Sequence, residues 1–149
     1  MVILLELNGI QLNQPIIDEM NKVPKAFKIQ DELKLSDLQT TEMPGDYFFD
    51  IKDNNFSVGF VTLTEVCFEV VEFDILIYER FRGKGYLKKV LSLIKKWIIE
   101  NKDYLYLDAI VYLDSESFEI MDSLLIKDGF LVSKNGDNNI YRKRLGGGN

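Results

Sequence analysis

Residues 71–97 read VEFDILIYERFRGKGYLKKVLSLIKKW, and this stretch decides the fold. Its first part alternates, so that Phe73, Ile75 and Ile77 point to one side of an extended strand and their neighbours to the other. Its last part has apolar residues at helical spacing, namely Leu87, Val90, Leu91, Ile94 and Trp97, with Ile98 continuing the series. The stretch therefore predicts a strand over 68–78, a glycine-containing turn, and an amphipathic helix ending near Asn101.

Patterns on either side of this unit complete the predicted architecture. Before it we expect a strand over 2–7, a short helix capped by Asn13 or Gln14 and stopped by Pro24, a possible second short helix within 28–41, and hairpin strands over 47–51 and 56–63. After it we expect a strand over 104–113, a helix over 115–127, and strands over 131–133 and 140–145. The strand–helix–strand unit implies one parallel pair. The prediction is a mixed α/β fold, mostly antiparallel, with helices on both faces of the sheet.

Composition limits what this chain is. With 149 residues and 46% hydrophobic content, residues 1–145 suit one domain, and 146–149 read as a flexible tail or a cloning remnant. A net charge of −6 argues against a nucleic-acid partner. The absence of histidine excludes imidazole catalysis and histidine metal sites, so no metal site is predicted. No apolar run approaches a membrane span, which leaves no membrane partner and a cytoplasmic location as the expectation.

The turn Arg82-Gly83-Lys84-Gly85 is a candidate anion site. Glycines let a backbone approach a ligand closely, and the helix that follows presents unpaired N–H groups and the positive end of its dipole. Phosphate is the usual anion at such a place. The spacing satisfies neither the P-loop nor the dinucleotide-binding pattern. An ordinary strand-to-helix turn with solvated basic residues stays open as the alternative.

Residues 71–97 resemble the central motif of the GNAT superfamily of acyl-CoA N-acyltransferases. That motif is a strand, a turn of the form Arg/Gln-x-x-Gly-x-Gly/Ala and a helix, and Arg82 and Gly85 match its first and fourth positions. Gly129-Phe130 also resembles the family's Gly-Phe ending of a later helix. The resemblance implies a central mixed sheet in which the parallel pair separates into a V-shaped gap.

The resemblance further implies acetyl-CoA as acyl donor. Its pyrophosphate would lie on the backbone N–H groups of Arg82, Gly83, Lys84, Gly85, Tyr86 and Leu87. The pantetheine arm would pair with the strand end around Ile77, and an amine would attack the thioester within the gap. Glu72 resembles the acidic residue often found upstream in this strand and is the candidate base, with Asp74 on the same face. A solvated role for both carboxylates stays open.

Two departures bear on activity. Leu87 stands where the family usually has Gly or Ala, so its side chain either packs under the helix or intrudes on the pyrophosphate. Leu125 stands where many members carry a tyrosine that acts as general acid, and Phe118 replaces a usual asparagine. Tyr112, Ser115 and Ser117 are nearby hydroxyls, none of which the sequence selects.

The leading hypothesis is an N-acetyltransferase that forms a ternary complex with an amine-bearing acceptor, which would be a small molecule or a protein. Its acidic body favours a cationic acceptor. The alternative is a GNAT-like domain without catalysis that acts as a binding or inhibitory partner, and a third reading is an unrelated α/β domain. A monomer and a homodimer formed through an exposed edge strand at 140–145 are both compatible with the sequence.

Overall fold

A computed structural model describes residues 1–24 and 32–146. Within them seven strands form one sheet: β1 (Val2–Leu7), β2 (Tyr47–Asp53), β3 (Phe56–Cys67), β4 (Val70–Ile77), β5 (Tyr106–Tyr112), β6 (Leu131–Asn135) and β7 (Asn138–Arg144). The helices are α1 (Gln14–Asn21), α2 (Tyr86–Asn101) and α3 (Phe118–Lys127), with short 3-10 turns η2 (Leu35–Asp37) and η3 (Glu79–Phe81). None of these helices is long and apolar enough to cross a membrane.

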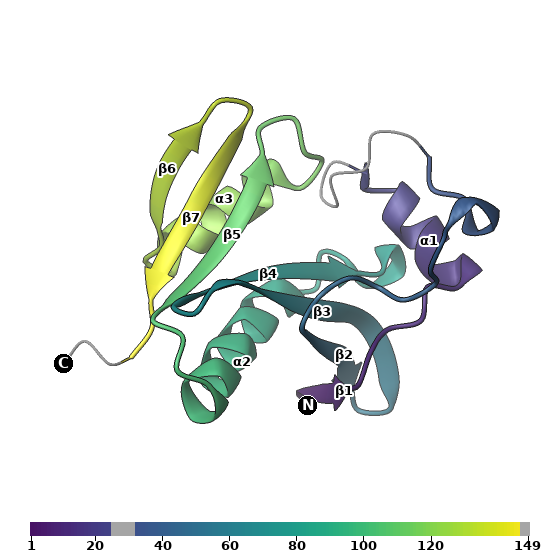
Figure 1. The fold of residues 1–149 in the computed structure, drawn as a ribbon, viewed down its shortest axis with the longest axis horizontal. Helices are drawn as coiled ribbons and strands as arrows, with labels where there is room; N and C mark the ends of the chain where they lie inside the picture. Colours follow the sequence, from purple (N-terminus) through teal and green to yellow (C-terminus); the bar gives the residue numbers. More distant parts are fainter. Residues whose placement is uncertain (25–31, 147–149) are drawn as a thin grey trace.

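The sheet has the order β1-β2-β3-β4-β5-β7-β6, and its centre is the parallel pair β4–β5. This pair is short: it joins Val70, Val71 and Glu72 to Tyr106, Leu107 and Asp108 and then ends. β4 stays paired with β3 up to Ile77, and β5 stays paired with β7 up to Tyr112. The two halves of the sheet therefore diverge, as the V between β4 and β5 in Figure 1 shows. The predicted gap is confirmed.

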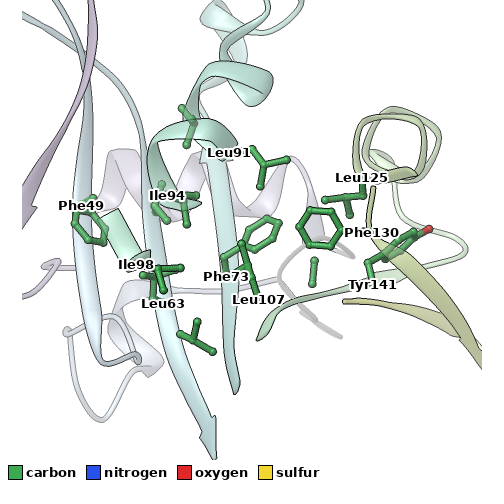
Figure 2. Packing of buried hydrophobic residues seen from close by; sticks show 14 of the residues in the cluster. Phe49, Leu63, Phe73, Leu91, Ile94, Ile98, Leu107, Leu125, Phe130 and Tyr141 are labelled. Atoms are coloured by element: carbon green, nitrogen blue, oxygen red, sulfur yellow. The ribbon is translucent and has the colours of Figure 1, made fainter. Parts of the chain in front are cut away.

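Two hydrophobic clusters hold helices on opposite faces of the sheet. The larger cluster packs α2 and α3 against one face; its members include Phe49, Leu63, Phe73, Leu91, Ile94, Ile98, Leu107, Leu125, Phe130 and Tyr141, which Figure 2 labels. The smaller one packs α1 against the other face through Ile17, Met20, Phe48, Phe60 and Leu76. β4 contributes Phe73 to the first cluster and Leu76 to the second, as the alternation predicted.

Local signals placed most elements correctly. The Asn13 side chain accepts a hydrogen bond from the N–H of Ile16 (3.0 Å) and caps α1, whose first turn contains Pro15. β3 runs to Cys67, four residues beyond its predicted end. Its last residues are exposed, and their pairing with β4 keeps them in the strand. β4 begins at Val70, since Phe68 and Glu69 form the turn that joins it to β3.

Four expectations need correction or lie, wholly or in part, outside the described residues. Of the possible helix within 28–41, residues 28–31 are not described and residues 32–41 contain only η2. α3 begins at Phe118, three residues later than predicted, because Ser115 closes a turn by donating its N–H to the Tyr112 carbonyl. β7 is an interior strand between β5 and β6, so the predicted exposed edge at 140–145 is wrong and the edges are β1 and β6. Residues 147–149 of the predicted tail are not described.

Candidate functional site

A cavity of about 300 Å³ opens where the end of β4, the glycine turn, the start of α2 and one side of α3 meet. We call it the loop cavity. Its lining contains most of the predicted cofactor-binding residues, namely Ile77, Arg82, Gly83, Gly85, Tyr86 and Leu87, together with Ile75, Leu76, Phe81, Lys88, Ser117, Ile120, Met121, Leu124 and Val23. Lys84 lies outside the lining, with its ammonium 5.8 Å from the centre of the Phe81 ring. The structure thus brings residues from four elements around one space.

The glycine turn has the backbone that its sequence requires. Gly83 and Gly85 have φ angles of +76° and +82°, a region that other residues rarely adopt. Gly85 is also the N-cap of α2, so the first N–H groups of a 16-residue helix follow directly. The N–H of Arg82 donates to the carbonyl of Glu79 (3.2 Å) and is already used. An anion at this turn would therefore meet the N–H groups from Gly83 to Leu87.

The Arg82 side chain is bound to groups outside the turn that precedes α2. Its Nε donates to the Ile77 carbonyl (3.0 Å), and its terminal nitrogen lies 3.9 Å from the Glu19 carboxylate on α1. The same carboxylate accepts the N–H of Glu79 (3.0 Å). Arg82 therefore ties β4 and α1 to the turn, and its charge is partly neutralised there. The sequence, which suggested Arg82 as added positive charge at the anion site, contained no signal for this arrangement.

The Tyr86 side chain fixes the start of α2 to the β2–β3 hairpin. Its hydroxyl donates to the Asp53 carboxylate over 2.6 Å. This bond lowers the pKa of Asp53 and raises the pKa of Tyr86, because it stabilises the ionised carboxylate and the protonated phenol. Tyr86 therefore contributes its backbone and ring to the cavity while its hydroxyl is committed to Asp53.

The two leucines that depart from the family pattern have different surroundings. Leu87 is half-buried against the larger core cluster and also lines the loop cavity. Leu125 is fully buried in the core, next to the sheet, so a side chain at this position does not face the loop cavity. The residues of this segment that do line it are the N-cap residue Ser117 and, within α3, Ile120, Met121 and Leu124. Only the first of these has a hydroxyl.

A second, smaller cavity of about 50 Å³ lies in the gap between β4 and β5. We call it the splay cavity. It shares Ile75, Ser117 and Met121 with the loop cavity, so the two spaces adjoin. Its further lining residues are Phe73, Asp74, Ala109, Ile110, Val111, Tyr112 and Ser115. A carboxylate and three hydroxyls therefore surround the point at which the strands separate.

The predicted base, Glu72, lies on β4 just before the position at which β4 and β5 separate. It pairs with Asp108 at the last position of the β4–β5 ladder and does not line the splay cavity. Asp74, on the same face of β4, does line it. Sequence alternation grouped the two carboxylates but could not rank them, because the end of the ladder is not visible in the pattern. Ser117 had no distinguishing signal in the sequence beyond its place before the helix.

Known structures share the fold of this chain. No protein-family model and no curated protein sequence matches the chain. Among solved structures, RimL, a ribosomal L7/L12 alpha-N-protein acetyltransferase in complex with coenzyme A, superposes with a TM-score of 0.58 at 14% identity, covering 66% of this chain and 62% of RimL. A GNAT family acetyltransferase from Elizabethkingia anophelis with acetyl-CoA bound gives a TM-score of 0.57 at 22% identity and covers 66% and 76%.

The chain has the GNAT fold. The microcin C7 self-immunity acetyltransferase MccE, in complex with acetyl-CoA and AMP, also matches, with a TM-score of 0.56 at 16% identity and coverage of 66% and 60%. The match thus spans less than two thirds of the lengths of RimL and MccE. The GNAT fold predicted from residues 71–97 is confirmed, together with its mixed sheet and its V-shaped gap.

Proposed function

We propose that this protein is an N-acetyltransferase that transfers the acetyl group of acetyl-CoA to an amine. The observation that supports it most directly is the pair of adjoining cavities, which lead from a glycine turn at a helix N-terminus to a carboxylate in the strand gap. RimL, MccE and the Elizabethkingia protein, which share the fold, are all acetyltransferases described with coenzyme A or acetyl-CoA. Fold alone does not carry activity, so the residues of the site have to support it.

The loop cavity fits the chemistry of the donor. A diphosphate suits the N–H groups of Gly83 to Leu87 and the positive end of the α2 dipole, with Lys88 at the cavity wall. The arm that carries the thioester is less polar, and Ile75, Ile77 and Met121 supply apolar walls for it. The Leu87 side chain packs against the core from its half-buried position, which leaves its backbone N–H as the group offered to the anion.

The splay cavity fits the chemistry of transfer. A neutral amine nitrogen attacks the thioester carbonyl carbon, a C–N bond forms, and the C–S bond breaks with its electron pair passing to sulfur. The nitrogen loses a proton, which a carboxylate can accept directly or through a water molecule. Asp74 lines the cavity, and Glu72 lies two residues before it on the same face of β4, within the paired part of the strand. We propose Asp74 as the acceptor of this proton, and Glu72 stays a prediction for the same role.

The class of acceptor is an amine. RimL is described as a ribosomal L7/L12 alpha-N-protein acetyltransferase and MccE as a microcin C7 self-immunity acetyltransferase, so acceptors of different kinds are compatible with the fold. The net charge of −6 favours encounter with cationic acceptors.

Binding of acetyl-CoA is tested first, by thermal denaturation with increasing ligand. A ligand that binds only the native state stabilises it by about 2.7 kcal/mol at 100 times its dissociation constant, which for a chain of this size raises the Tm by about 5–10 °C. Lys88→Glu, at the cavity, should weaken binding about tenfold, equivalent to about 1.4 kcal/mol of repulsion. Lys96→Glu, on the exposed side of the same helix, is the matched control. No shift at any concentration would exclude the proposal.

Turnover is tested by release of free thiol with a panel of primary amines. Asp74→Asn should slow turnover strongly and leave acetyl-CoA binding intact, because the carboxylate acts on the acceptor and not on the donor. Glu72→Gln tests the sequence prediction in the same assay, and the variant with the larger loss identifies the base. Saturable binding of acetyl-CoA without thiol release from any amine would favour the binding or inhibitory protein instead.

A further inference from the structure

One edge of β5 borders the strand gap over several residues. The ladder to β4 ends at Asp108, whereas β5 continues to Tyr112. Four consecutive residues, 109–112, line the splay cavity. Side chains of a strand alternate between its two faces, so a consecutive run indicates that the edge of β5 borders this cavity. Among the described residues, none from β5 lines the loop cavity, so the space proposed for the donor leaves this edge available.

The pairing of β5 with β7 determines which backbone groups point into the gap. In an antiparallel pair, alternate residues direct both their N–H and their C=O at the partner strand. At the two ends of β5, the Leu105 carbonyl accepts the N–H of Leu145 (2.7 Å), and the Leu113 N–H donates to the turn between β6 and β7 (2.9 Å). The Tyr106 N–H instead donates to the residue before β4 (3.0 Å). Odd-numbered residues of β5 therefore face β7, and even-numbered residues face β4.

Beyond the end of the ladder, the even-numbered residues of β5 are Ile110 and Tyr112. The carbonyl of Tyr112 already accepts the N–H of Ser115 (3.0 Å). The gap therefore receives an N–H and a C=O from Ile110 and an N–H from Tyr112. These are the groups with which the edge of a sheet binds a short segment of extended peptide.

On the basis of the proposed function, we propose that the acceptor is the N-terminus of a protein, bound as a short strand on β5. β5 runs from the point of the V towards its open end (Figure 1), so a peptide whose amine reaches the point runs parallel to β5. Its first residue then accepts the Ile110 N–H, and its third residue donates to the Ile110 carbonyl and accepts the Tyr112 N–H. The amine lies beside Asp74, which follows the last paired residue of β4 by two positions and lines the same cavity.

The chemistry of the cavity favours an α-amine over a lysine side chain. In the transfer step the nitrogen forms the C–N bond, the electron pair of the C–S bond passes to sulfur, and a carboxylate takes the proton. The chain has no histidine as a stronger base, so an acceptor that is already partly neutral reacts faster. With a pKa of about 7.7–8.0, an α-amine is about 9–17% neutral at pH 7, whereas a lysine, with a pKa of about 10.4, is about 0.04% neutral.

The size of the cavity points the same way. At about 50 Å³ it has room for about four water-sized groups. That volume suits the amine and the reacting carbonyl, while the rest of the acceptor lies along the edge of β5.

The length of the acceptor tests the strand. In the thiol-release assay, alanine amide supplies one of the three hydrogen bonds, dialanine amide two and trialanine amide three. Each is worth about 1 kcal/mol, so kcat/KM for the acceptor should rise about fivefold at each of the two steps. It should then stay level for tetra-alanine and penta-alanine amides. A series that is level from alanine amide onwards would overturn the proposal, because it shows that the peptide backbone is not used.

Ester substitution in tetra-alanine amide locates the hydrogen bonds without changing the protein. An ester oxygen in place of the N–H of the third residue removes the bond to the Ile110 carbonyl, and kcat/KM should fall about fivefold. The same replacement at the fourth residue is the matched control, because that N–H points away from β5. A loss at the fourth residue as large as that at the third would contradict the parallel strand.

Other amines separate this inference from the proposed function. Nα-acetyl-lysine methylamide and propylamine should be at least about 100-fold poorer acceptors than trialanine amide at pH 7. If either is the better acceptor, the peptide strand is wrong and the transferase stands. If the protein releases thiol with no peptide and no other amine, the proposed function is wrong as well.

Discussion

At Gly59 the backbone of β3 lies against the backbone of β4 and leaves no room for a side chain. Gly59 pairs with Ile77, at the end of β4 that lines the loop cavity. A Cβ atom added at Gly59 would lie 1.9 Å from the carbonyl oxygen of Leu76, 2.9 Å from its carbonyl carbon and 3.0 Å from the Cα of Ile77. All three atoms are backbone, so no side chain can rotate away. Gly59→Ala must therefore push the two strands apart.

The cost follows from this displacement. Ordinary contact begins near 3.4 Å, so the strands must separate locally by about 1.5 Å. The hydrogen bond from the Tyr78 N–H to the Val58 carbonyl, now 2.9 Å, would be lost. Overpacking costs about 1–3 kcal/mol and the lost hydrogen bond about 1 kcal/mol, against which alanine gains about 0.4–1 kcal/mol through the unfolded chain. The free energy of unfolding should fall by about 1–4 kcal/mol.

Urea denaturation followed by Trp97 fluorescence measures this change, with the midpoint lowered and the slope unchanged. Gly9→Ala is the matched control, because a Cβ at Gly9 meets no atom within 4 Å and the residue has no positive φ. That substitution should be neutral or stabilising by up to about 1 kcal/mol. Gly59→Ala should therefore lower the free energy of unfolding, whereas Gly9→Ala should leave it unchanged or raise it. Equal or greater stability of Gly59→Ala would refute the close approach of β3 and β4 beside the cavity.

Three further substitutions test the packing around the site. Burial and the hydrogen bond to Asp122 raise the pKa of Tyr141 to about 12. Tyr141→Phe should therefore lower the free energy of unfolding by about 1–3 kcal/mol. In denaturation at alkaline pH, the whole of this difference should be present below pH 10 and should vanish as the pH rises towards 12. Burial raises the pKa of Asp128, but the hydrogen bonds that it accepts, first among them the one from Lys95, have the larger effect. The net result is a pKa below the ordinary value of 3.8. Asp128→Asn should therefore cost about 1–2 kcal/mol above pH 4, and the difference should disappear in acid as the folded carboxylate titrates. Leu87→Ala should lower stability by about 1–2 kcal/mol, less than for a fully buried leucine, and leave acetyl-CoA affinity by titration unchanged, because only its N–H is proposed to bind.

The elements that sequence predicted well are those whose signals are local. The alternation of β4 and the helical spacing of α2 depend only on which side of each element is buried. The cap of α1 needs only Asn13 and the backbone three residues later. The glycines of the turn predict a positive φ because other residues avoid it, and Gly83 and Gly85 both adopt one.

The features that sequence missed depend on residues distant in the chain. The turn sequence suggests Arg82 as a charge for an anion, but its partners come from β4 and from α1, where Glu19 lies 63 positions before it. Gly59 gave no turn signal, since its constraint is the backbone of another strand. The interior position of β7 follows from its pairing with β5 over seven residues, which a pattern of its own side chains does not contain.

The different positions of Asp74 and Glu72 show why the proposed site is difficult to predict from sequence. Side-chain alternation is the same whether a strand is paired on one side or on two, so it continues unchanged from Glu72 to Asp74. What differs is the neighbouring backbone: β5 is paired with β4 up to Glu72, and beyond that residue β5 stays paired with β7 alone. From that point the side of β4 that faces away from β3 borders a cavity instead of a strand. Backbone groups exposed in this way need hydrogen-bond partners, and an amide-bearing arm of the acyl donor would provide them. In the proposed function, the place where the ladder ends therefore sets both the room for the donor and the carboxylate that reaches it.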